Sequence, residues 1–197
     1  MMKYVIVIVL TAVLMGCTGE KVYSPKPRMY PKVVYPNKVY EEKEMDYCDF
    51  LFRAPTYMEV VQDQYFYEDK IVHPCWFDLL VPELRASLHC SYYPLSDRAE
   101  LDRLVYDAFQ VTNEHNKKAN YIKDNLISMP EYAVHGMIFR VEGPVASPVQ
   151  FFLTDSTSHF FRASLYFNSK VDADSTAPIV EYLQIDIDSL IASWRWR

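Results

Sequence analysis

The chain has 197 residues, half of them hydrophobic, and a formal net charge of −6 at pH 7. This mild negative charge is spread along the chain, whereas proteins that bind nucleic acid carry a basic surplus or patch. Only four glycines are present, and two of them lie near Cys17, so the glycine-rich loops that hold nucleotide phosphates cannot be built. We therefore expect no nucleic-acid partner, no nucleotide and no cofactor.

The first sixteen residues have the pattern of a lipoprotein signal peptide. Lys3 provides the positive charge, residues 4–13 are uncharged and mostly apolar, and the run Leu14-Met15-Gly16-Cys17 has the form of a lipobox. The apolar stretch is shorter than the about 20 residues that cross a bilayer core, although an uncleaved membrane anchor is the alternative. The sequence predicts cleavage before Cys17 and acylation of its thiol, which would hold the chain on a membrane. The absence of a dense acidic run after Cys17 favours a position that faces the periplasm over export to the cell surface. We expect the periplasmic face of the outer membrane, although the sequence does not itself distinguish the two membranes.

Residues 17–46 are predicted to be a lipidated tether rich in proline and tyrosine. The prolines oppose a helix and favour extended backbone, so the segment after Cys17 would reach about 90 Å at roughly 3.1 Å per residue. Tyr30-Pro31 and Tyr35-Pro36 recur at a five-residue interval, with basic residues between and around them. Aromatic and basic side chains on an extended strand suit docking into a groove, either of the chain's own domain or of a partner. A plain flexible spacer is the alternative.

Residues 47–197 are predicted to form a single domain that begins with short strands. Residues 85–93 alternate apolar and polar side chains, which is the period-two signal of a half-buried strand. We expect this run to form a hairpin with the apolar run before it, through Pro82-Glu83-Leu84. The strands expected in this part of the chain are 50–52, 57–61, 76–81 and 85–93.

Two amphipathic helices are predicted in the rest of the domain. The first is capped by Ser96 and runs to about Asn116, with an apolar stripe at helical spacing. The second carries its stripe from Ile179 to Trp194 and has Pro178 in its first turn. Hairpin strands interrupted by one helix and closed by another indicate an α+β fold with a single antiparallel sheet, and this order resembles a PsbP-like α-β-α sandwich. The strands expected between the helices are 132–141, 147–154 and 159–168.

Three cysteines remain for the folded part once Cys17 is acylated. In an oxidising compartment Cys48 and Cys75 could pair, which would tie the start of the domain to the strand at 76–81. Cys90 would then be left over as a small buried residue. Other pairings stay open, because connectivity cannot be deduced from sequence alone.

Asp155, Ser156 and His159 are the residue types of a hydrolase triad. A triad usually assembles from distant chain positions, whereas these three crowd one short turn with no Gly-x-Ser-x-Gly elbow. We interpret them as side chains that cap the backbone of that turn. Asp172 and Asp174 lie at i and i+2 before the last helix and are interpreted as solvated capping residues rather than an acid–base pair. No catalytic site emerges, so we expect no enzyme activity.

His73, Cys75, His89 and Cys90 carry the donor atoms of a zinc site. Their spacing fits no familiar zinc pattern, and Cys75 is a candidate for the disulfide with Cys48. His89 and Cys90 are adjacent on a predicted strand, so they would face opposite sides of the sheet. We therefore expect no metal.

The second half of the chain carries a longer and more specific pattern. Its parts are Gln150-Phe151-Phe152-Leu153-Thr154-Asp155-Ser156-Thr157, His159-Phe160, Arg162, Leu165-Tyr166-Phe167-Asn168, Ala173-Asp174-Ser175, Ala177-Pro178 and Trp196, and upstream Pro27-Arg28, Tyr30-Pro31, Pro74-Cys75-Trp76 and Ala119. This pattern resembles the GldD gliding-motility lipoproteins of Bacteroidota over essentially the whole mature chain. Cys90 and Gly143-Pro144-Val145 depart from it locally.

The resemblance implies an envelope lipoprotein needed for surface gliding and for the associated type IX secretion machinery, with no established enzymatic role. Our first hypothesis is a non-enzymatic scaffold or assembly factor that binds other gliding or secretion envelope proteins, since Arg and Tyr dominate binding hot spots. One alternative is a periplasmic small-ligand or glycan-binding lipoprotein with Trp76, Tyr92 and Tyr93 lining a pocket, and another is a cell-wall hydrolase. The candidate contact residues are Tyr30, Tyr35, Asp155, Ser156, His159 and Arg162.

Overall fold

A computed structural model describes residues 32–62, 65–66, 69–70, 73–168 and 173–197 of the chain. The predicted signal peptide, Cys17, Tyr30 and Asp172 lie outside the described residues. The chain from Lys32 to Arg197 forms one unit. None of the helices in this part of the chain has the length and apolar character needed to cross a bilayer.

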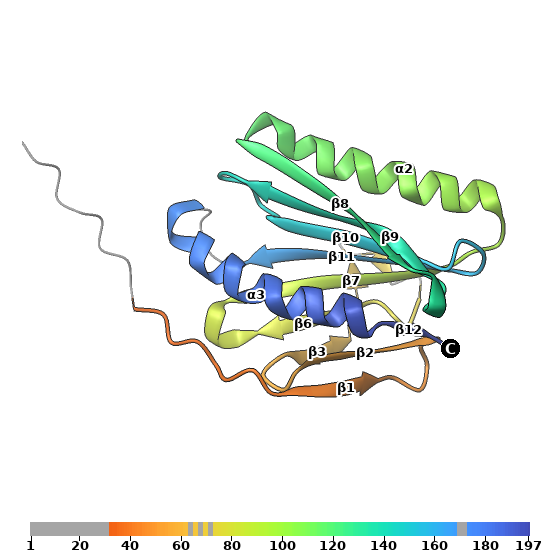
Figure 1. Ribbon diagram of the computed structural model, residues 1–197, viewed down its shortest axis with the longest axis horizontal. Coiled ribbons are helices and arrows are strands. Elements are labelled where there is room, and N and C mark those ends of the chain that lie inside the picture. The colour runs from red at the N-terminus through yellow and green to blue at the C-terminus, as the bar shows by residue number, and fades with distance from the viewer. Residues whose placement is uncertain (1–31, 63–64, 67–68, 71–72, 169–172) are drawn as a thin grey trace, which may run out of the picture. The chain divides into compact units, whose positions relative to one another are not determined.

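The centre of the fold is an antiparallel sheet, to which seven strands of the described chain contribute (Figure 1). The β6–β7 hairpin turns through a 3₁₀ segment at Pro82–Leu84, which confirms the predicted hairpin. Further along the sheet, beyond β11, a Cβ at Gly136 on β9 would overlap the carbonyl oxygen of Phe152 on β10, so the close approach of these strands requires glycine. In spatial order the strands are β3 (Glu59–Gln62), β6 (Phe77–Val81), β7 (Ala86–Pro94), β11 (His159–Phe167), β10 (Val149–Thr154), β9 (Val134–Glu142) and β8 (Tyr121–Met129).

The helix α2 (Arg98–Glu114) covers part of one face of this sheet. Asp97 is its N-cap, because its backbone is extended and its carboxylate accepts a hydrogen bond from the Glu100 N–H at 2.8 Å. The predicted cap, Ser96, lies one residue too early and instead donates its hydroxyl to the Glu100 carboxylate at 2.8 Å. The buried cluster between helix and sheet comprises Leu101, Leu104, Ala108, Phe139, Phe152 and Phe160.

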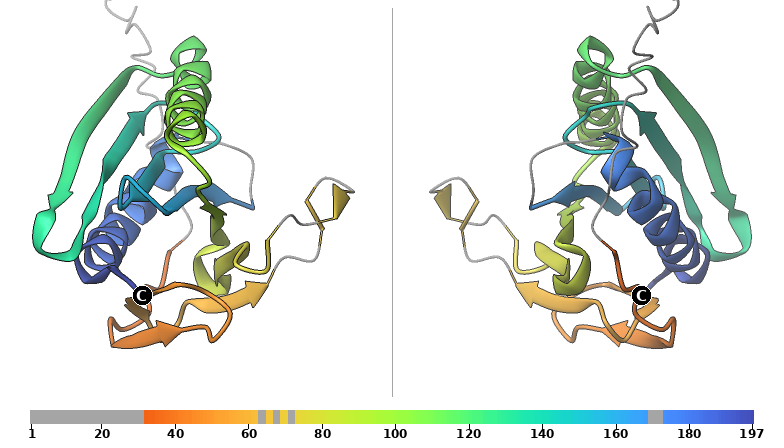
Figure 2. Two further views of the ribbon diagram at one scale, coloured as in Figure 1. Left: turned by 90° about the vertical axis from the view of Figure 1, so that its right-hand side faces the viewer. Right: turned by 90° about the vertical axis from the view of Figure 1, so that its left-hand side faces the viewer.

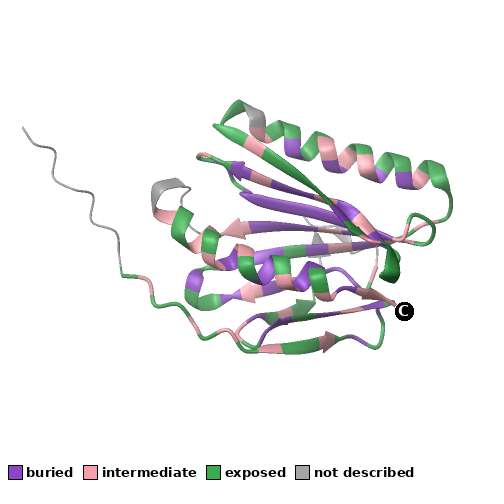
Figure 3. Cartoon of the chain, in the orientation of Figure 1, coloured by how far each residue is buried: buried purple, intermediate pink, exposed green. Residues whose placement is uncertain are grey.

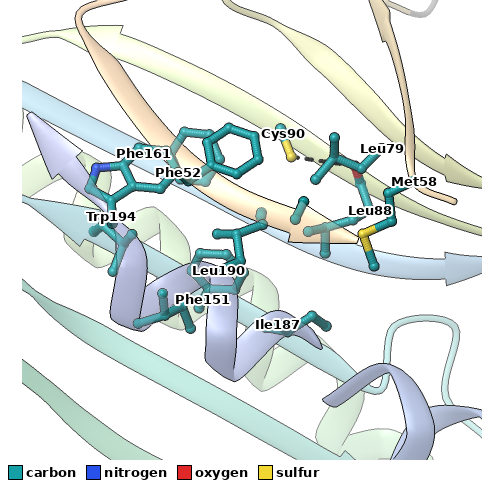
Figure 4. Packing of buried hydrophobic residues seen from close by; sticks show 14 of the residues in the cluster. Phe52, Met58, Leu79, Leu88, Cys90, Phe151, Phe161, Ile187, Leu190 and Trp194 are labelled. Atoms are coloured by element: carbon teal, nitrogen blue, oxygen red, sulfur yellow. Dashed lines mark hydrogen bonds between the residues drawn. The ribbon is translucent and has the colours of Figure 1, made fainter. Parts of the chain in front are cut away.

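The opposite face of the sheet is covered by the helix α3 (Ala173–Ser193) and a small sheet of β1 (Tyr40–Glu44), β2 (Phe50–Pro55) and β12 (Arg195–Trp196). Figure 2 shows α3 between the small sheet and the β8–β9 hairpin. Rings from β2, from β11 and from the residue that follows α3 meet in this core, where Trp194 packs with Phe52 and Phe161 (Figure 4). The stripe predicted for this helix is confirmed, since Leu183 and Ile187 are buried with Trp194.

Both faces of the central strands are therefore covered, and β10 is buried along its whole length (Figure 3). Successive side chains of a strand point to opposite faces, so Phe151 packs in the α3 core and Phe152 in the α2 cluster. The arrangement is an α-β-α sandwich, and the predicted α+β class is confirmed.

Several elements differ from the sequence predictions. β1 lies in the segment assigned to the tether, because its polar residues form a strand only through pairing with β2. β8 has mostly exposed side chains at the edge of the sheet, so its sequence lacks the alternation that marks a half-buried strand. α3 begins at Ala173, which places Pro178 inside the helix rather than in its first turn. A further hairpin joins β4 (Tyr65–Phe66) to β5 (Asp69–Lys70).

Candidate functional site

The turn between β10 and β11 is closed by one carboxylate. Asp155 accepts hydrogen bonds from the backbone N–H groups of Thr157, Ser158 and His159 at 2.8–2.9 Å. Burial raises the pKa of Asp155, but these three bonds and the Thr157 hydroxyl outweigh it and hold the pKa below its ordinary value. Ser156 adopts a left-handed backbone with φ 70° and donates its N–H to the Thr154 hydroxyl. The hydrogen bonds of the carboxylate therefore stabilise the turn itself.

The imidazole of His159 has partners outside the suspected triad. Its Nδ1 lies 2.6 Å from the Tyr92 hydroxyl, and its ring stacks on Trp196 with centroids 5.1 Å apart. Asp155 reaches the backbone of His159 and not its ring nitrogen. The structure therefore places Asp155, Ser156 and His159 together in a turn without forming a Ser–His–Asp relay.

Trp196 connects this turn to a second one, between β8 and β9. Its indole N–H donates to the Ala133 carbonyl at 3.1 Å, and the neighbouring Arg195 guanidinium lies 3.2 Å from the centroid of the Tyr132 ring. We call the surface formed by residues 155–159, Tyr132, Arg195 and Trp196 the distal surface. It lies near the C-terminus, at the right of Figure 1. Tyr132 and Arg195 were not predicted as contact residues, because only the tertiary fold brings them beside the β10–β11 turn.

Arg162, another predicted contact residue, lies away from the distal surface. Side chains alternate along β11, so Arg162 shares its face with Phe160, which packs under α2, whereas His159 lies on the α3 face. Its direct neighbours across the sheet are Ser91 on β7 and Phe152 on β10. The structure therefore does not bring Arg162 together with the turn residues.

A second group of functional side chains surrounds a buried acid in α3. Asp186 is 1% exposed, and its Oδ1 lies 2.6 Å from the Tyr40 hydroxyl and 2.7 Å from the Lys38 ammonium. The Tyr57 hydroxyl donates to its other oxygen. Asp186 was not among the predicted site residues. An acidic residue on the apolar stripe between Leu183 and Leu190 could have indicated it, because a buried carboxylate needs polar partners.

The segment Lys32–Val39, which we call the arm, lies against α3 through this group. Lys38 also donates to the carbonyl oxygen of Tyr182 at 2.8 Å and lies 3.7 Å from the centroid of its ring. Tyr35 packs on the same ring with centroids 4.7 Å apart, and the Tyr182 hydroxyl donates to the Pro36 carbonyl. Of the two docking modes expected for Tyr35, the structure shows the one on the chain's own domain.

Three tyrosine hydroxyls of these two regions resist ionisation, that of the buried Tyr92 and those of the half-buried Tyr40 and Tyr57. Burial, aided by the Asp186 carboxylate, raises the pKa of Tyr40 to about 12 and also raises that of Tyr57. Burial, aided by the charges of Asp49 and Asp155, raises the pKa of Tyr92 to about 12. Each of these hydroxyls is therefore protonated at neutral pH.

In an alkaline titration of the folded protein, Tyr40 and Tyr92 are expected to ionise near pH 12 instead of the ordinary 10.0. Because folding favours the protonated hydroxyl, this contribution to stability is complete below pH 10 and is lost as the pH rises towards 12. Tyrosinate absorbance measures the ionisation, and Tyr92→Phe should remove one late-titrating group. Full ionisation near pH 10 while circular dichroism still reports a folded chain would contradict the expectation.

The suspected zinc residues have other roles. Cys48 and Cys75 form a disulfide with Cα atoms 5.6 Å apart, the pairing considered from the sequence, and Cys90 is buried outside it. The His89 Nδ1 lies 2.5 Å from Asp78, on the sheet face opposite to Cys90. Among the described residues, no group of three or more His, Cys, Asp or Glu could hold a metal ion.

The aromatic residues suspected of lining a pocket pack on one another. The Trp76 indole N–H donates to the Tyr92 carbonyl at 2.8 Å, and its ring meets Tyr93 edge-on at 5.3 Å. Open hollows of about 390 and 420 Å³ lie elsewhere. The first is lined by Leu80, Val81, Pro82, Arg85, Ala86 and Asn168, and the second by Glu42, Leu51, Arg53, Ser189, Ala192, Ser193 and Arg195.

Comparison with known proteins bears on both fold and family. No curated protein matches the chain. The solution structure of cyanobacterial PsbP (CyanoP) from Synechocystis sp. PCC 6803 is similar with a TM-score of 0.50 and 9% identity, covering 82% of this chain and 95% of that one. At this identity the similarity shows the fold alone.

The family model described as gliding motility lipoprotein GldD matches residues 20–196. The chain therefore belongs to the GldD family of gliding motility lipoproteins, which are lipid-anchored proteins of the cell envelope and not a known enzyme family.

Proposed function

We propose that the protein is a non-enzymatic scaffold or assembly factor for gliding and the associated type IX secretion. Acylated Cys17 would anchor it at the periplasmic face of the outer membrane, and its partners would be other envelope proteins of the same machinery. The supporting observation is the distal surface, where three separate chain segments bring together two stacked pairs, His159 on Trp196 and Arg195 on Tyr132.

The chemistry of these pairs suits protein–protein contact. Trp, Tyr and Arg are the residue types enriched in binding hot spots. Trp196 and Arg195 are held in place by stacking and by hydrogen bonds to backbone carbonyls, so little side-chain freedom would be lost on binding. The commitment of the Asp155 carboxylate to backbone N–H groups supports a structural role for the turn rather than hydrolysis.

The double variant Arg195→Ala/Trp196→Ala is expected to lose its partners. Two hot-spot side chains, each worth more than about 1 kcal/mol, correspond together to about a thirtyfold or larger loss in affinity. Crosslinking in living cells followed by mass spectrometry would measure recovery of gliding and secretion components, with spreading of colonies as the second readout. A variant that recovers the same components and glides normally would refute the proposed surface.

The matched control is Arg103→Ala/Tyr106→Ala on α2, which removes the same kinds of side chain from an exposed helix face. It should retain partners and gliding. Because β12 also pairs with β2, Tyr132→Ala serves as a second distal variant that leaves this pairing intact. Urea unfolding of each variant separates lost binding from lost folding.

A further inference from the structure

The two edges of the central sheet differ in length. β3, at one edge, has four residues, whereas β8, at the other, has nine. Within the described chain no strand pairs with the side of β8 that faces away from β9, and Figure 2 shows β8 at the outer rim of the sheet. We call this side of Tyr121–Met129 the free edge. The backbone N–H and C=O groups of an unpaired edge are a template for pairing with another chain.

The free edge is regular along its whole length. The register of β8 with β9 runs one to one from Tyr121 opposite Glu142 to Met129 opposite Val134, so the strand contains no bulge. It also contains no proline and no glycine. Proteins use shortness, bulges and proline to keep an edge from pairing, and β8 has none of these. A strand of this kind can accept a further strand by β-augmentation.

An exposed leucine marks one face of the free edge. Leu126 lies on the α2 face of the sheet, since it is directly opposite Met137, which packs against the α2 cluster. Its side chain is 76% exposed, because α2 packs mainly over β10 and β11. Ile122 lies on the same face of β8 and is half-buried. Apolar side chains on an added strand would cover both residues and remove apolar surface from water.

Two adjacent charges of the free edge have no ion pair within the described chain. Lys123 and Asp124 are both exposed, and as neighbours in a strand they point to opposite faces, so they do not pair with each other. Lys123 is directly opposite a like charge, Arg140 on β9, which is itself paired with Asp188 of α3 at 2.6 Å. An acid opposite Lys123 on an added strand, and a base opposite Asp124, would complete two ion pairs.

A second copy of the chain does not supply these charges. In an antiparallel pair of β8 strands related by a two-fold axis perpendicular to the sheet, each face of one copy continues the same face of the other. Lys123 and Asp124 lie on opposite faces, so they cannot meet across such an interface in any register. The longest register, centred on Asn125, would place Lys123 opposite Ile127 and Asp124 opposite Leu126. The charges therefore favour a different chain.

We propose that the free edge binds an extended segment of a partner protein, which adds to the sheet as a further strand beside β8. Every strand pair of the central sheet is antiparallel in the part of the chain that the structure describes, so the segment runs antiparallel to β8. Opposite Leu126 to Ile122 its residues are then, in its own chain order, apolar, polar, basic, acidic and apolar. Backbone hydrogen bonds give the affinity, and this order of side chains gives the specificity.

This inference deepens the proposed function, on which it rests for the existence of an envelope partner. The free edge and the distal surface are joined through the chain, because β8 leads directly into the Pro130–Tyr132 turn that carries Tyr132. A partner that contacts the distal surface therefore has the free edge within its reach.

Photo-crosslinking in living, gliding cells tests the proposal. A benzoylphenylalanine residue replaces the exposed Ser128 on β8 or, as the control, the exposed Tyr106 on α2. Mass spectrometry of the adducts identifies the crosslinked peptide of the partner. We expect position 128 to give an adduct with a segment of another envelope protein that has the order of side chains given above. Position 106 should give no adduct with that segment.

The charges of the free edge are tested by exchanging them. Lys123→Asp/Asp124→Lys keeps the net charge and is expected to lower the adduct yield about tenfold or more, because two ion pairs become like-charge pairs. Exchanging the basic and acidic residues of the identified segment should restore the yield, and Leu126→Lys should lower it similarly. The matched control is Arg98→Asp/Asp102→Arg, which exchanges an exposed ion pair on α2 and should leave the yield unchanged. Urea unfolding confirms that each variant folds.

The outcomes separate this inference from the proposed function. Position 128 overturns the partner strand if it gives no adduct, or adducts with a second copy of the chain or with residues 18–31 of the chain itself. A partner segment that lacks the expected order, or an adduct yield that the charge exchange leaves unchanged in a folded chain, overturns it as well. If Arg195→Ala/Trp196→Ala still loses its partners in these cases, the proposed function stands, whereas partners and gliding that survive this variant too overturn both.

Discussion

Replacing Trp194 by alanine is expected to lower the free energy of unfolding by about 3–5 kcal/mol. The side chain is fully buried, with ring centroids 4.6 Å from Phe50 and 4.3 Å from Phe161. It thus joins α3, the small sheet and the main sheet in one core, and the cavity left by alanine would lie between all three. Urea unfolding followed by circular dichroism measures the loss as a lower midpoint at constant slope.

Trp194→Phe is the matched control for this loss. Phenylalanine keeps a ring in the stack and removes an indole N–H that has no hydrogen-bond partner among the described residues. We expect a cost below about 1.5 kcal/mol, typical of a conservative exchange in a core. Similar losses for alanine and phenylalanine would show that the aromatic stack is not what stabilises this junction.

Removing the disulfide by Cys48→Ser/Cys75→Ser is expected to cost about 3–4 kcal/mol. The bond closes a loop with a sequence separation of 27 residues, and this length gives that value in the chain-entropy treatment. Cys48 precedes β2 and Cys75 precedes β6, so the bond links the small sheet to the main one. A thiol reductant should lower the unfolding midpoint of the wild type to that of the variant and leave the variant unchanged.

Cys90→Ala provides the comparison for this experiment. Cys90 is buried outside the disulfide, so its loss removes a small apolar contact and the weak hydrogen bond from its thiol to the Leu88 carbonyl. A double variant no less stable than Cys90→Ala would mean that the two sheets hold together without the covalent link.

The sequence predicts best those elements whose burial is periodic. The β6–β7 hairpin and the stripe of α3 were recoverable because one face of each is apolar and the other is not. β8 and β1 were missed because their side chains are mostly exposed, and their strand character comes only from backbone pairing with β9 and β2.

In the candidate site, local contacts could be predicted from the sequence, whereas contacts between distant chain segments could not. The role of Asp155 follows from local composition, because its partners lie within four residues of it. The neighbours of Trp196 could not be predicted, since His159 and Ala133 are 37 and 63 residues away along the chain. Tyr35 was a candidate for docking, with a flexible spacer as the alternative. The choice depends on Tyr182 and Asp186, which only the fold brings to Tyr35 and Lys38 of the arm.

The docking of the arm on α3 has a mechanical consequence. A protein held by a lipid at one end and by a moving partner at the other would carry tension, and here the tension would pass through the arm. Tyr35 and Lys38 hold the arm on Tyr182 and Asp186 of α3, so these contacts would bear the load. Under force the arm would stay docked until it detaches from α3. The rate of detachment is set by the activation barrier to detachment and not by the equilibrium affinity of the arm for α3. Detachment would lengthen the chain between the lipid and the domain by about 25–30 Å, the extended length of the arm.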